Sequence, residues 1–469
     1  MADDHSAGAV SAYDSRLTAT PAIDRIGEEG ARFDHAFCEN SLCTPSRAAI
    51  LTGVYSHVHG ATTLATPFDA RQPAFPGLLR DAGYQTMLVG KWHLGHGGIH
   101  DPHGFDRWSV LPDQGDYHDP TFLEPGGREI VRPGYVTDVI TDVTLNWLAD
   151  RDRSRPFCLL VHHKAPHRSW EPADRHAGLF EGEDVPEPPT LRDDYSGRAS
   201  PAREARMRIA EDLTEEDLKS PVPAGLDGDA ELRWRYQRYI KDYLRCVAAL
   251  DDSVGRLLDG LDAAGLADDT IVVYTSDQGF FLGEHGWYDK RFMDEASIRM
   301  PLLVRYPRLV PTGSVVDRIV VNVDFAPTFL ELAGVPVPNR MQGRSLVPLL
   351  AGTQPDDWRT AMYYRYWMHL DSIHRVGAHY GIRTERYKLI HYYGQACGQP
   401  GAADDPRPPE WELFDLVADP FERRSVYDDP DYAGVAGALT GQLRRLQEEL
   451  GDTAPRTIET ATDHPRGAR

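Results

Sequence analysis

The stretch Ile271-Val272-Val273-Tyr274-Thr275-Ser276-Asp277-Gln278-Gly279 is a short apolar run that ends abruptly in polar residues. Residues 86–90 likewise lead into Lys91-Trp92-His93, and residues 157–161 lead into the histidine-rich run 162–167. Continuous apolar runs of this length are typical of strands buried on both faces, as in a parallel sheet flanked by helices. In such α/β folds ligands collect at the carboxyl ends of strands, so we expect these polar residues to form a site.

Helical spacing separates the apolar runs. Between residues 239 and 261 apolar side chains recur every three to four residues, and Gly265 follows as a stop. The sequence therefore predicts an α/β catalytic domain over residues 1–355, with a large, mixed and mostly parallel sheet flanked by helices. Residues 181–230, rich in charge and proline, interrupt this domain as a surface excursion, which is either a solvated loop or a lid over the site.

From about residue 355 the pattern changes. Residues 387–393 and 411–415 are typical of short antiparallel strands. A closing helix places its apolar residues on one face: Val435, Leu439, Leu443, Leu446 and Leu450. We expect a small α+β subdomain over residues 356–469 that carries an antiparallel sheet.

The composition excludes several classes of protein. The 469 residues carry 50 Lys+Arg against 72 Asp+Glu, a net charge of −22, and 41% are hydrophobic. These values predict a folded acidic protein and argue against nucleic-acid binding, which needs a basic face, without excluding an anionic substrate. No apolar run reaches the ~18–20 residues of a membrane span. The scattered cysteines and polar amino terminus predict neither a disulfide framework nor a signal peptide, hence a cytoplasmic protein as written.

The most specific motif is the string Cys43-Thr44-Pro45-Ser46-Arg47-Ala48-Ala49-Ile50-Leu51-Thr52-Gly53. Its residues alone indicate a turn that opens a helix, with Cys43 and Arg47 near the amino end. A helix amino terminus and a neighbouring guanidinium both favour an anion and a lowered thiol pKa. The alternative is a buried structural cysteine beside a surface arginine.

This string resembles the signature C-x-P-S-R-x-x-x-L-T-G of the sulfatases, formylglycine-dependent type I enzymes of the alkaline phosphatase superfamily. The resemblance implies that a formylglycine-generating or equivalent maturation enzyme oxidises Cys43 to formylglycine, and that Arg47 offsets charge on the sulfate. In the family, one hydroxyl of the hydrated aldehyde attacks sulfur and expels the alcohol. The other hydroxyl then loses its proton, the aldehyde reforms and sulfate departs.

Two further clusters are similar to sulfatase elements. Lys91 and His93 lie in G-K-W-H-L-G, which resembles the family's G-K-W-H-x-G. This implies that Lys91 holds the nucleophile's oxygen and a sulfate oxygen, and that His93 takes a proton. The run His163-Lys164-Ala165-Pro166-His167 resembles the segment whose histidine contacts sulfate and leaving group. We expect that histidine to be His167, with His163 as second choice and one of the two in a packing role.

The longest resembling stretch covers residues 276–290. The resemblance implies that Asp277 and Gln278 are metal ligands and that Lys290 is a second sulfate-binding cation. Many relatives have Asn where this chain has Gln278, whose extra methylene changes the reach of the amide oxygen.

The aspartate pair Asp3 and Asp4 matches the pair that completes the metal site in sulfatases, and the resemblance implies that the modified Cys43 is a further metal ligand. Carboxylate and amide oxygens suit hard divalent cations and are poor ligands for thiophilic metals. The resemblance therefore implies one divalent cation, Ca²⁺ as first choice and Mg²⁺ as second.

The resemblance extends from Asp3 to about residue 427, and its last part is similar to the small carboxyl-terminal subdomain of sulfatases. Residues 104–117 look most like bacterial relatives that act on sulfated sugars. The expected activity is hydrolysis of a sulfate monoester on a carbohydrate, such as a 6-sulfated N-acetylglucosamine. The alternatives are a phosphonate or phosphodiester hydrolase of the same superfamily and an inactive glycan-binding homologue.

The amino terminus breaks the pattern, because only Met1 and Ala2 precede the Asp3-Asp4 pair. In sulfatases this pair ends the first, central strand. We therefore expect Met1 to be an internal methionine, with roughly 5–10 residues of strand upstream of it. An export signal upstream would make the protein periplasmic or secreted.

Overall fold

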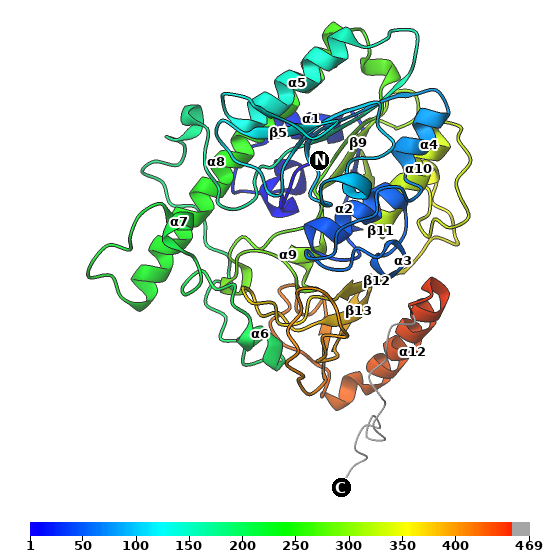
Figure 1. Cartoon of the computed structure of the whole chain (residues 1–469). Helices are drawn as coiled ribbons and strands as arrows, with labels where there is room; N and C mark the ends of the chain where they lie inside the picture. The colour runs from blue at the N-terminus through cyan, green and yellow to red at the C-terminus, as the bar shows by residue number, and fades with distance from the viewer. Residues whose placement is uncertain (453–469) are drawn as a thin grey trace.

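Strand β3 (Gln85–Lys91) is an interior strand of a five-stranded sheet of order β6-β5-β4-β3-β7. Four strands flank it: β4 (Arg107–Leu111), β5 (Thr121–Glu124), β6 (Arg128–Val131) and β7 (Phe157–His162). β3 pairs in parallel with β4 and β7, whereas β5 and β6 continue the sheet antiparallel. Every residue of β3 is buried, which its continuous apolar run predicts. The structure, a computed structural model, describes residues 1–452 (Figure 1).

A second sheet has the order β10-β1-β9-β8. Its strands are β1 (Ala31–Phe33), β8 (Val272–Thr275), β9 (Leu302–Arg305) and β10 (Ser314–Val316). β1 is parallel to β10 but antiparallel to β9, and β8 is also antiparallel to β9. A short parallel pair, β2 (Ala36–Phe37) with β11 (Val320–Val321), lies beside it. The fold is thus mixed α/β, and parallel pairs occur both at β3 and in the pairs β1/β10 and β2/β11.

The first residues of the chain lie between the two sheets. The Met1 amino group donates to Val161 O at 2.8 Å, and Met1 O accepts from the His163 amide at 2.9 Å. Ala2 N donates to Thr275 O at 2.8 Å, beside a parallel bridge from Ala2 to Ser276. These contacts bring residues 1–2 between β7 and β8 and direct the following aspartates to the carboxyl ends of both strands. The expected upstream strand residues stay a prediction.

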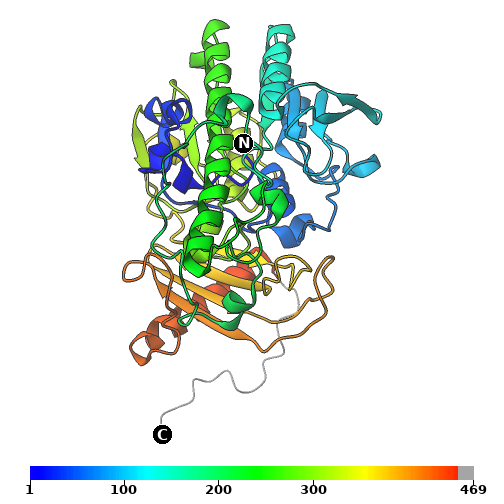
Figure 2. The ribbon, with the colours of Figure 1, turned by 90° about the vertical axis from the view of Figure 1, so that its left-hand side faces the viewer.

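Helices cover the sheets on both sides (Figures 1 and 2). The long helix α8 (Gly228–Ala263) packs with α1 (Pro21–Glu28) and α5 (Val136–Asp150). A second group packs together on the other side: α2 (Cys43–Thr52), α4 (Phe75–Asp81) and α10 (Phe325–Leu332). Short helices complete the domain: α3 (Ser56–His59), α9 (Glu295–Ile298) and α11 (Val347–Leu350). Within residues 1–452, no helix combines the length and apolar character needed to cross a membrane.

The excursion of residues 181–230 is packed rather than solvated. It contains α6 (Ser200–Glu204) and α7 (Glu215–Leu218), and its last residues already belong to α8. Eight of its apolar side chains are buried: Val185, Leu191, Ala202, Ala205, Met207, Ile209, Leu213 and Leu218. The solvated-loop interpretation is therefore wrong, because proline and charge report surface position but not whether the apolar residues between them pack.

The last part of the chain forms an antiparallel sheet of order β12-β13-β14-β15. Its strands are β12 (Ala361–Tyr366), β13 (His379–Thr384), β14 (Tyr387–Tyr392) and β15 (Glu410–Asp415). Helix α12 (Ala433–Leu450) packs on it through Leu439 and Leu443, on the predicted face. The sheet shares one apolar core with β2 and β9. The subdomain therefore packs directly against the catalytic domain, as the ribbon in Figure 2 shows. Residues 453–469 of the predicted subdomain lie outside the described residues.

Candidate active site

The carboxyl ends of the central strands bring together side chains that are far apart in sequence. Lys91 is the last residue of β3, Asp277 follows β8, and His167 lies in the loop after β7. Eight residues meet there, and we call them the strand-end cluster: Asp3, Asp4, Cys43, Arg47, Lys91, His167, Asp277 and Lys290. Nearly all of them are buried. The rule that ligands gather at strand ends explains the convergence.

Cys43 is the first residue of α2, and it is only 1% exposed. Its Sγ donates to Asp3 Oδ1 at 3.5 Å. Burial raises the pKa of the Cys43 thiol, and the nearby cations Lys290 and Lys91 offset this only in part. The lowered thiol pKa that the sequence suggested is therefore wrong. The local neighbours were identified correctly, but desolvation outweighs them.

Three carboxylates lie side by side in the cluster. The Asp4 amide donates to Asp277 Oδ1 at 3.2 Å. Burial raises the pKa of Asp4 to about 7, with Lys290 opposing the shift and Asp3 adding to it. Burial and the neighbouring Asp3 raise the pKa of Asp277 to about 6. Asp3 is also desolvated, but Lys91 and His167 hold its pKa well below the ordinary range. Such crowding of carboxylates creates a strong demand for cations.

Basic side chains of the protein neutralise part of the negative charge of these three carboxylates. Lys290 Nζ donates to both oxygens of Asp4, at 2.6 and 2.7 Å, and Lys91 Nζ donates to Asp3. Arg47 Nε donates to Asp277 Oδ2 at 3.0 Å, and its terminal nitrogen lies 3.4 Å from Asp3 Oδ1. Arg47 therefore bridges two of the three carboxylates.

The cluster has the donor set of a divalent cation site. Asp3, Asp4, Cys43 and His167 each offer a ligand atom, and these atoms lie within 4.8 Å of one another. Gln278 adjoins them, since its Nε2 donates to Asp4 while its buried Oε1 has no partner within residues 1–452. A half-turn of this amide would bring Oε1 to the carboxylates. The oxygen-rich set fits a hard cation.

The two candidate histidines occupy different environments. His167 Nδ1 donates to Arg168 O at 2.8 Å, and its Nε2 faces Asp4 Oδ2 at 3.6 Å. His163 points elsewhere, because its Nε2 lies 3.3 Å from Ser253 Oγ on helix α8. The structure thus brings His167 into the strand-end cluster and places His163 outside it.

His93 lies at the edge of the cluster and contacts a residue that the sequence did not single out. Gln114 donates to His93 Nε2 at 3.3 Å and also accepts from Lys91 Nζ. Burial, followed by the charge of Lys91, lowers the pKa of His93 well below its usual value, so the ring is neutral. Gln114 follows β4 as the other residues follow their strands, and the strand-end rule was the signal that would have found it.

Lys164 is a second residue that sequence reasoning missed. Its Nζ donates to Gln114 O at 3.2 Å and lies 4.7 Å from the centre of the Tyr117 ring. Burial and the charge of Lys91 lower the pKa of Lys164 to about 8. It adds a buried cation beside Gln114 and Tyr117.

A polar wall adjoins Lys290, and half of it comes from the carboxyl-terminal subdomain. Asp289 accepts from Arg291 Nε at 3.1 Å and lies 3.3 Å from His374 Nε2. His374 Nδ1 lies 3.3 Å from Asp371 Oδ1. All four residues are nearly buried. No local pattern marked residues 371–374, because their place depends on how the subdomain packs.

Comparison with known proteins assigns the chain to a family. Residues 1–335 match the family described as Sulfatase, and residues 283–449 match the one described as N-sulphoglucosamine sulphohydrolase, C-terminal. The N-acetylglucosamine-6-O-sulfatase of Bacteroides thetaiotaomicron is 45% identical over 98% of this chain and 87% of its own length. The human N-acetylglucosamine-6-sulfatase is 30% identical over 73% of this chain and 62% of its own.

A solved structure supports the same assignment. It is a protein in complex with its substrate D-glucosamine-2-N,6-O-disulfate, which superposes with a TM-score of 0.91 and 45% identity over 97% of this chain and 98% of the other. Two thirds of the chain thus match one family at the level of sequence, and nearly all of it matches a relative in sequence and fold. The chain belongs to the sulfatase family of the alkaline phosphatase superfamily and is a sulfuric ester hydrolase.

Proposed function

We propose that this sulfatase removes the 6-O-sulfate of a glucosamine-type sugar, using formylglycine derived from Cys43 and one Ca²⁺. The observation that carries the proposal is the position of Cys43 at the start of α2, within contact of Asp3 and flanked by Lys91 and Lys290. A nucleophile there is surrounded by the cations that an anionic sulfate ester requires.

Residues of this chain supply most of the remaining chemistry. Lys91, Lys290 and Arg47 offset the negative charge on the sulfuryl oxygens, where charge builds up during transfer. In its protonated form His167 presents the Nε2 hydrogen to the leaving oxygen, since its Nδ1 hydrogen is committed to Arg168 O. The neutral ring of His93 is available to take a proton.

Two groups complete the site. Formylglycine supplies a hydrated aldehyde, which can both attack sulfur and release sulfate without water attacking sulfur. Asp3, Asp4, Asp277 and Gln278 would hold the cation, whose charge polarises the sulfate ester as a Lewis acid. Maturation of Cys43 requires a formylglycine-generating or equivalent enzyme as a partner.

The sugar assignment rests on the relatives and on the polar wall beside Lys290. Two relatives named as N-acetylglucosamine-6-sulfatases match the chain at 45% and 30% identity. Asp289, Arg291 and His374 provide carboxylate, guanidinium and imidazole groups beside Lys290. Groups of this kind hydrogen-bond sugar hydroxyls, which supports a carbohydrate leaving group.

The test is sulfate release from defined sugars. The full chain, coexpressed with a formylglycine-generating enzyme and loaded with Ca²⁺, is assayed on N-acetylglucosamine 6-sulfate, galactose 6-sulfate and an aryl phosphonate. We expect kcat/KM to be highest on the first substrate. A preference for galactose 6-sulfate overturns the sugar assignment, and a preference for the phosphonate favours the related hydrolase activity. Peptide mass analysis of Cys43 checks that the tested protein carries the aldehyde.

A further inference from the structure

The loop that carries His167 is held by the excursion of residues 181–230. Arg168, the next residue, donates from Nε to Asp217 Oδ1 at 2.6 Å and from its terminal nitrogen to Oδ2 at 2.5 Å. Lys219 Nζ donates to Ser169 O at 2.9 Å. Ser169 Oγ also donates to Glu216 Oε1 at 3.4 Å. Glu216, Asp217 and Lys219 lie in or directly after α7, so this short helix contacts the His167 loop at three points.

The same arginine fixes the ring of His167 through its backbone. Arg168 O accepts the hydrogen of His167 Nδ1 at 2.8 Å, and Tyr117 Oη donates to His167 O at 2.5 Å. A hydrogen bond at one ring nitrogen sets the tautomer and orientation of the other nitrogen. In this case it leaves Nε2 directed into the strand-end cluster.

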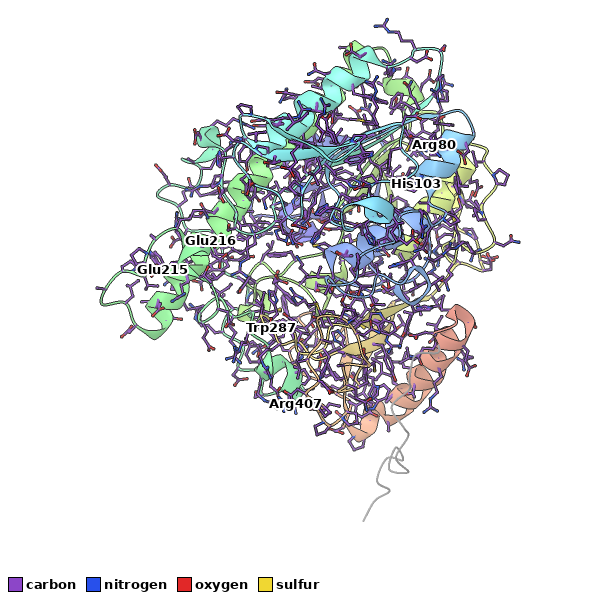
Figure 3. All side chains as sticks on the ribbon, in the orientation of Figure 1. Arg80, His103, Glu215, Glu216, Trp287 and Arg407 are labelled. Atoms are coloured by element: carbon purple, nitrogen blue, oxygen red, sulfur yellow. The ribbon has the colours of Figure 1, made fainter. Side chains whose placement is uncertain are left out.

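Asp217 is itself held firmly. Its Oδ2 accepts from the Thr214 amide and from Thr214 Oγ1, both at 2.8 Å, which closes a capping box at the start of α7. Lys219 Nζ also lies 3.0 Å from Asp242 Oδ2 on helix α8. Asp217 is 1% exposed, whereas its neighbours Glu215 and Glu216 are on the outer surface of the same helix (Figure 3).

Arg168 is restrained on its other face as well. Its guanidinium carbon lies 5.1 Å from the centre of the Tyr288 ring, in the segment that leads to Lys290. The guanidinium group of Arg168 therefore lies between the Asp217 carboxylate and an aromatic ring, and these two contacts restrict its orientation. A planar, bidentate contact of this kind restrains the backbone that carries it more than a single contact does.

We propose that Asp217 is a positioning residue for the reaction: by holding Arg168 in a fork, it fixes the carbonyl that orients His167 Nε2 toward the leaving oxygen. This inference rests on the proposed function. It also assigns a role to the excursion of residues 181–230. In this role α7 orients His167 through the His167 loop and does not close over the substrate.

Two substrates separate positioning from simple stabilisation. A sugar sulfate has a poor alkoxide leaving group that needs His167, whereas 4-nitrophenyl sulfate has a good one that needs little help. We expect Asp217→Asn to lower kcat on the sugar sulfate roughly 10-fold, with KM within about 2-fold of wild type. On 4-nitrophenyl sulfate the same variant keeps kcat within about 2-fold. The matched control is Glu215→Gln, which makes the same type of change two residues earlier on the exposed face of α7. It should change neither rate.

A second variant removes the other partner of the bidentate pair between Arg168 and Asp217. Arg168→Gln should reproduce the substrate-selective loss, and the double variant Asp217→Asn with Arg168→Gln should be no slower than either single one, because both remove one interaction. Amide hydrogen exchange over residues 165–170 should accelerate in Asp217→Asn, while exchange in β3 stays unchanged. If Asp217→Asn does not fold, Arg168→Gln carries the test alone.

The outcomes are distinct. Wild-type kcat on the sugar sulfate in folded Asp217→Asn, or an equal loss on both substrates, overturns the positioning role and leaves the proposed function intact. Additive losses in the double variant overturn it as well. A correctly matured wild-type enzyme that is inactive on both sulfates overturns the proposed function and this inference with it.

Discussion

Two buried charge clusters in this molecule differ in the set of basic side chains that pairs with their carboxylates. In the domain-junction cluster, defined by Arg198, Asp294, Tyr392 and Glu412, the arginine bonds Asp294 at 2.9 Å and Glu412 at 2.8 Å. Glu412 also accepts from the Ala199 amide and from Tyr392 Oη, at 2.8 and 3.0 Å. In the strand-end cluster Arg47 likewise bridges two carboxylates, but Asp3 and Asp4 also pair with lysines, Lys91 and Lys290.

The difference separates structural from functional charge. Arg198 has a planar fork that bonds two carboxylates at once, and the further acceptors of Glu412 are filled by the backbone and a hydroxyl. A lysine is a compact point charge on a flexible stem, so Lys91 and Lys290 can exchange a carboxylate for a sulfate oxygen. The first cluster joins four segments of the chain, whereas the lysines of the second can bind a substrate in place of their carboxylates.

The comparison is tested most severely at Cys43. Cys43→Ser should lower multi-turnover kcat on the order of 10⁶-fold, as removal of a nucleophile does, because serine lacks the second hydroxyl of the hydrated aldehyde. The unfolding midpoint should stay close to wild type, since the substitution keeps the size of the buried side chain. Kinetics and thermal unfolding of the same preparation check this. Sustained turnover by the serine variant would eliminate the formylglycine mechanism.

Asp277 tests the metal side of the strand-end cluster. Asp277→Ala should lower kcat roughly 10³-fold and deplete bound divalent metal, because one hard ligand is lost. Arg47 then loses one carboxylate but keeps Lys91 O and Asp3, so the fold should survive. Elemental analysis of the purified protein measures the metal. Wild-type metal content together with a wild-type rate would remove Asp277 from the site.

At the domain junction the same type of change should act on stability instead. Glu412→Gln should lower the free energy of unfolding by about 3 kcal/mol, because a buried, paired carboxylate is replaced and Arg198 loses a charged partner. The kcat of the folded fraction should stay at the wild-type level. As control, Asp357→Asn removes the exposed partner of Arg344 and should leave the unfolding midpoint unchanged. A large kcat loss in Glu412→Gln would break the distinction between the clusters.

The strand-end residues were predictable because each follows a run that identifies its strand. Lys91, Asp277 and the 163–167 segment are distant in sequence, but strands of one fold present their carboxyl ends to the same edge. Gln114 obeys the same rule, yet the strand before it contains Ser109 and carries no recognisable motif. The antiparallel course of β9 was not predictable, since an apolar run does not record strand direction.

What escaped prediction depends on contacts between segments. Burial of Cys43, which reverses its pKa shift, is a property of the packed helix and not of its neighbours in sequence. His374 reaches the site only because the subdomain packs against the strand ends. The excursion was interpreted as solvated because its charges are visible in the sequence, but their partners, such as Arg168 for Asp217, are not.

Another buried carboxylate, that of Glu39, adds a third case to the comparison because it pairs with no Lys or Arg of residues 1–452. Its oxygens accept from Ser56, at 2.6 Å from Oγ and 3.4 Å from the amide. His59 Nε2 is 4.0 Å away, and burial lowers the pKa of His59 to about 3, so that ring is neutral. Burial raises the pKa of Glu39 from 4.5 to about 8.

The sign of the resulting pH dependence follows from proton counting. Between about pH 5 and pH 8 the unfolded chain releases the Glu39 proton that the folded chain keeps, so the folded state binds more protons and stability falls as pH rises. Glutamine mimics the neutral carboxyl at every pH. Glu39→Gln should therefore remove about 3 to 4 kcal/mol of this decline, measured by denaturant unfolding at pH 5 and pH 8. The exposed Glu129→Gln should leave the decline as in wild type. If Glu39→Gln falls as steeply as wild type, Glu39 is ionised in the folded protein and a cation must reach it.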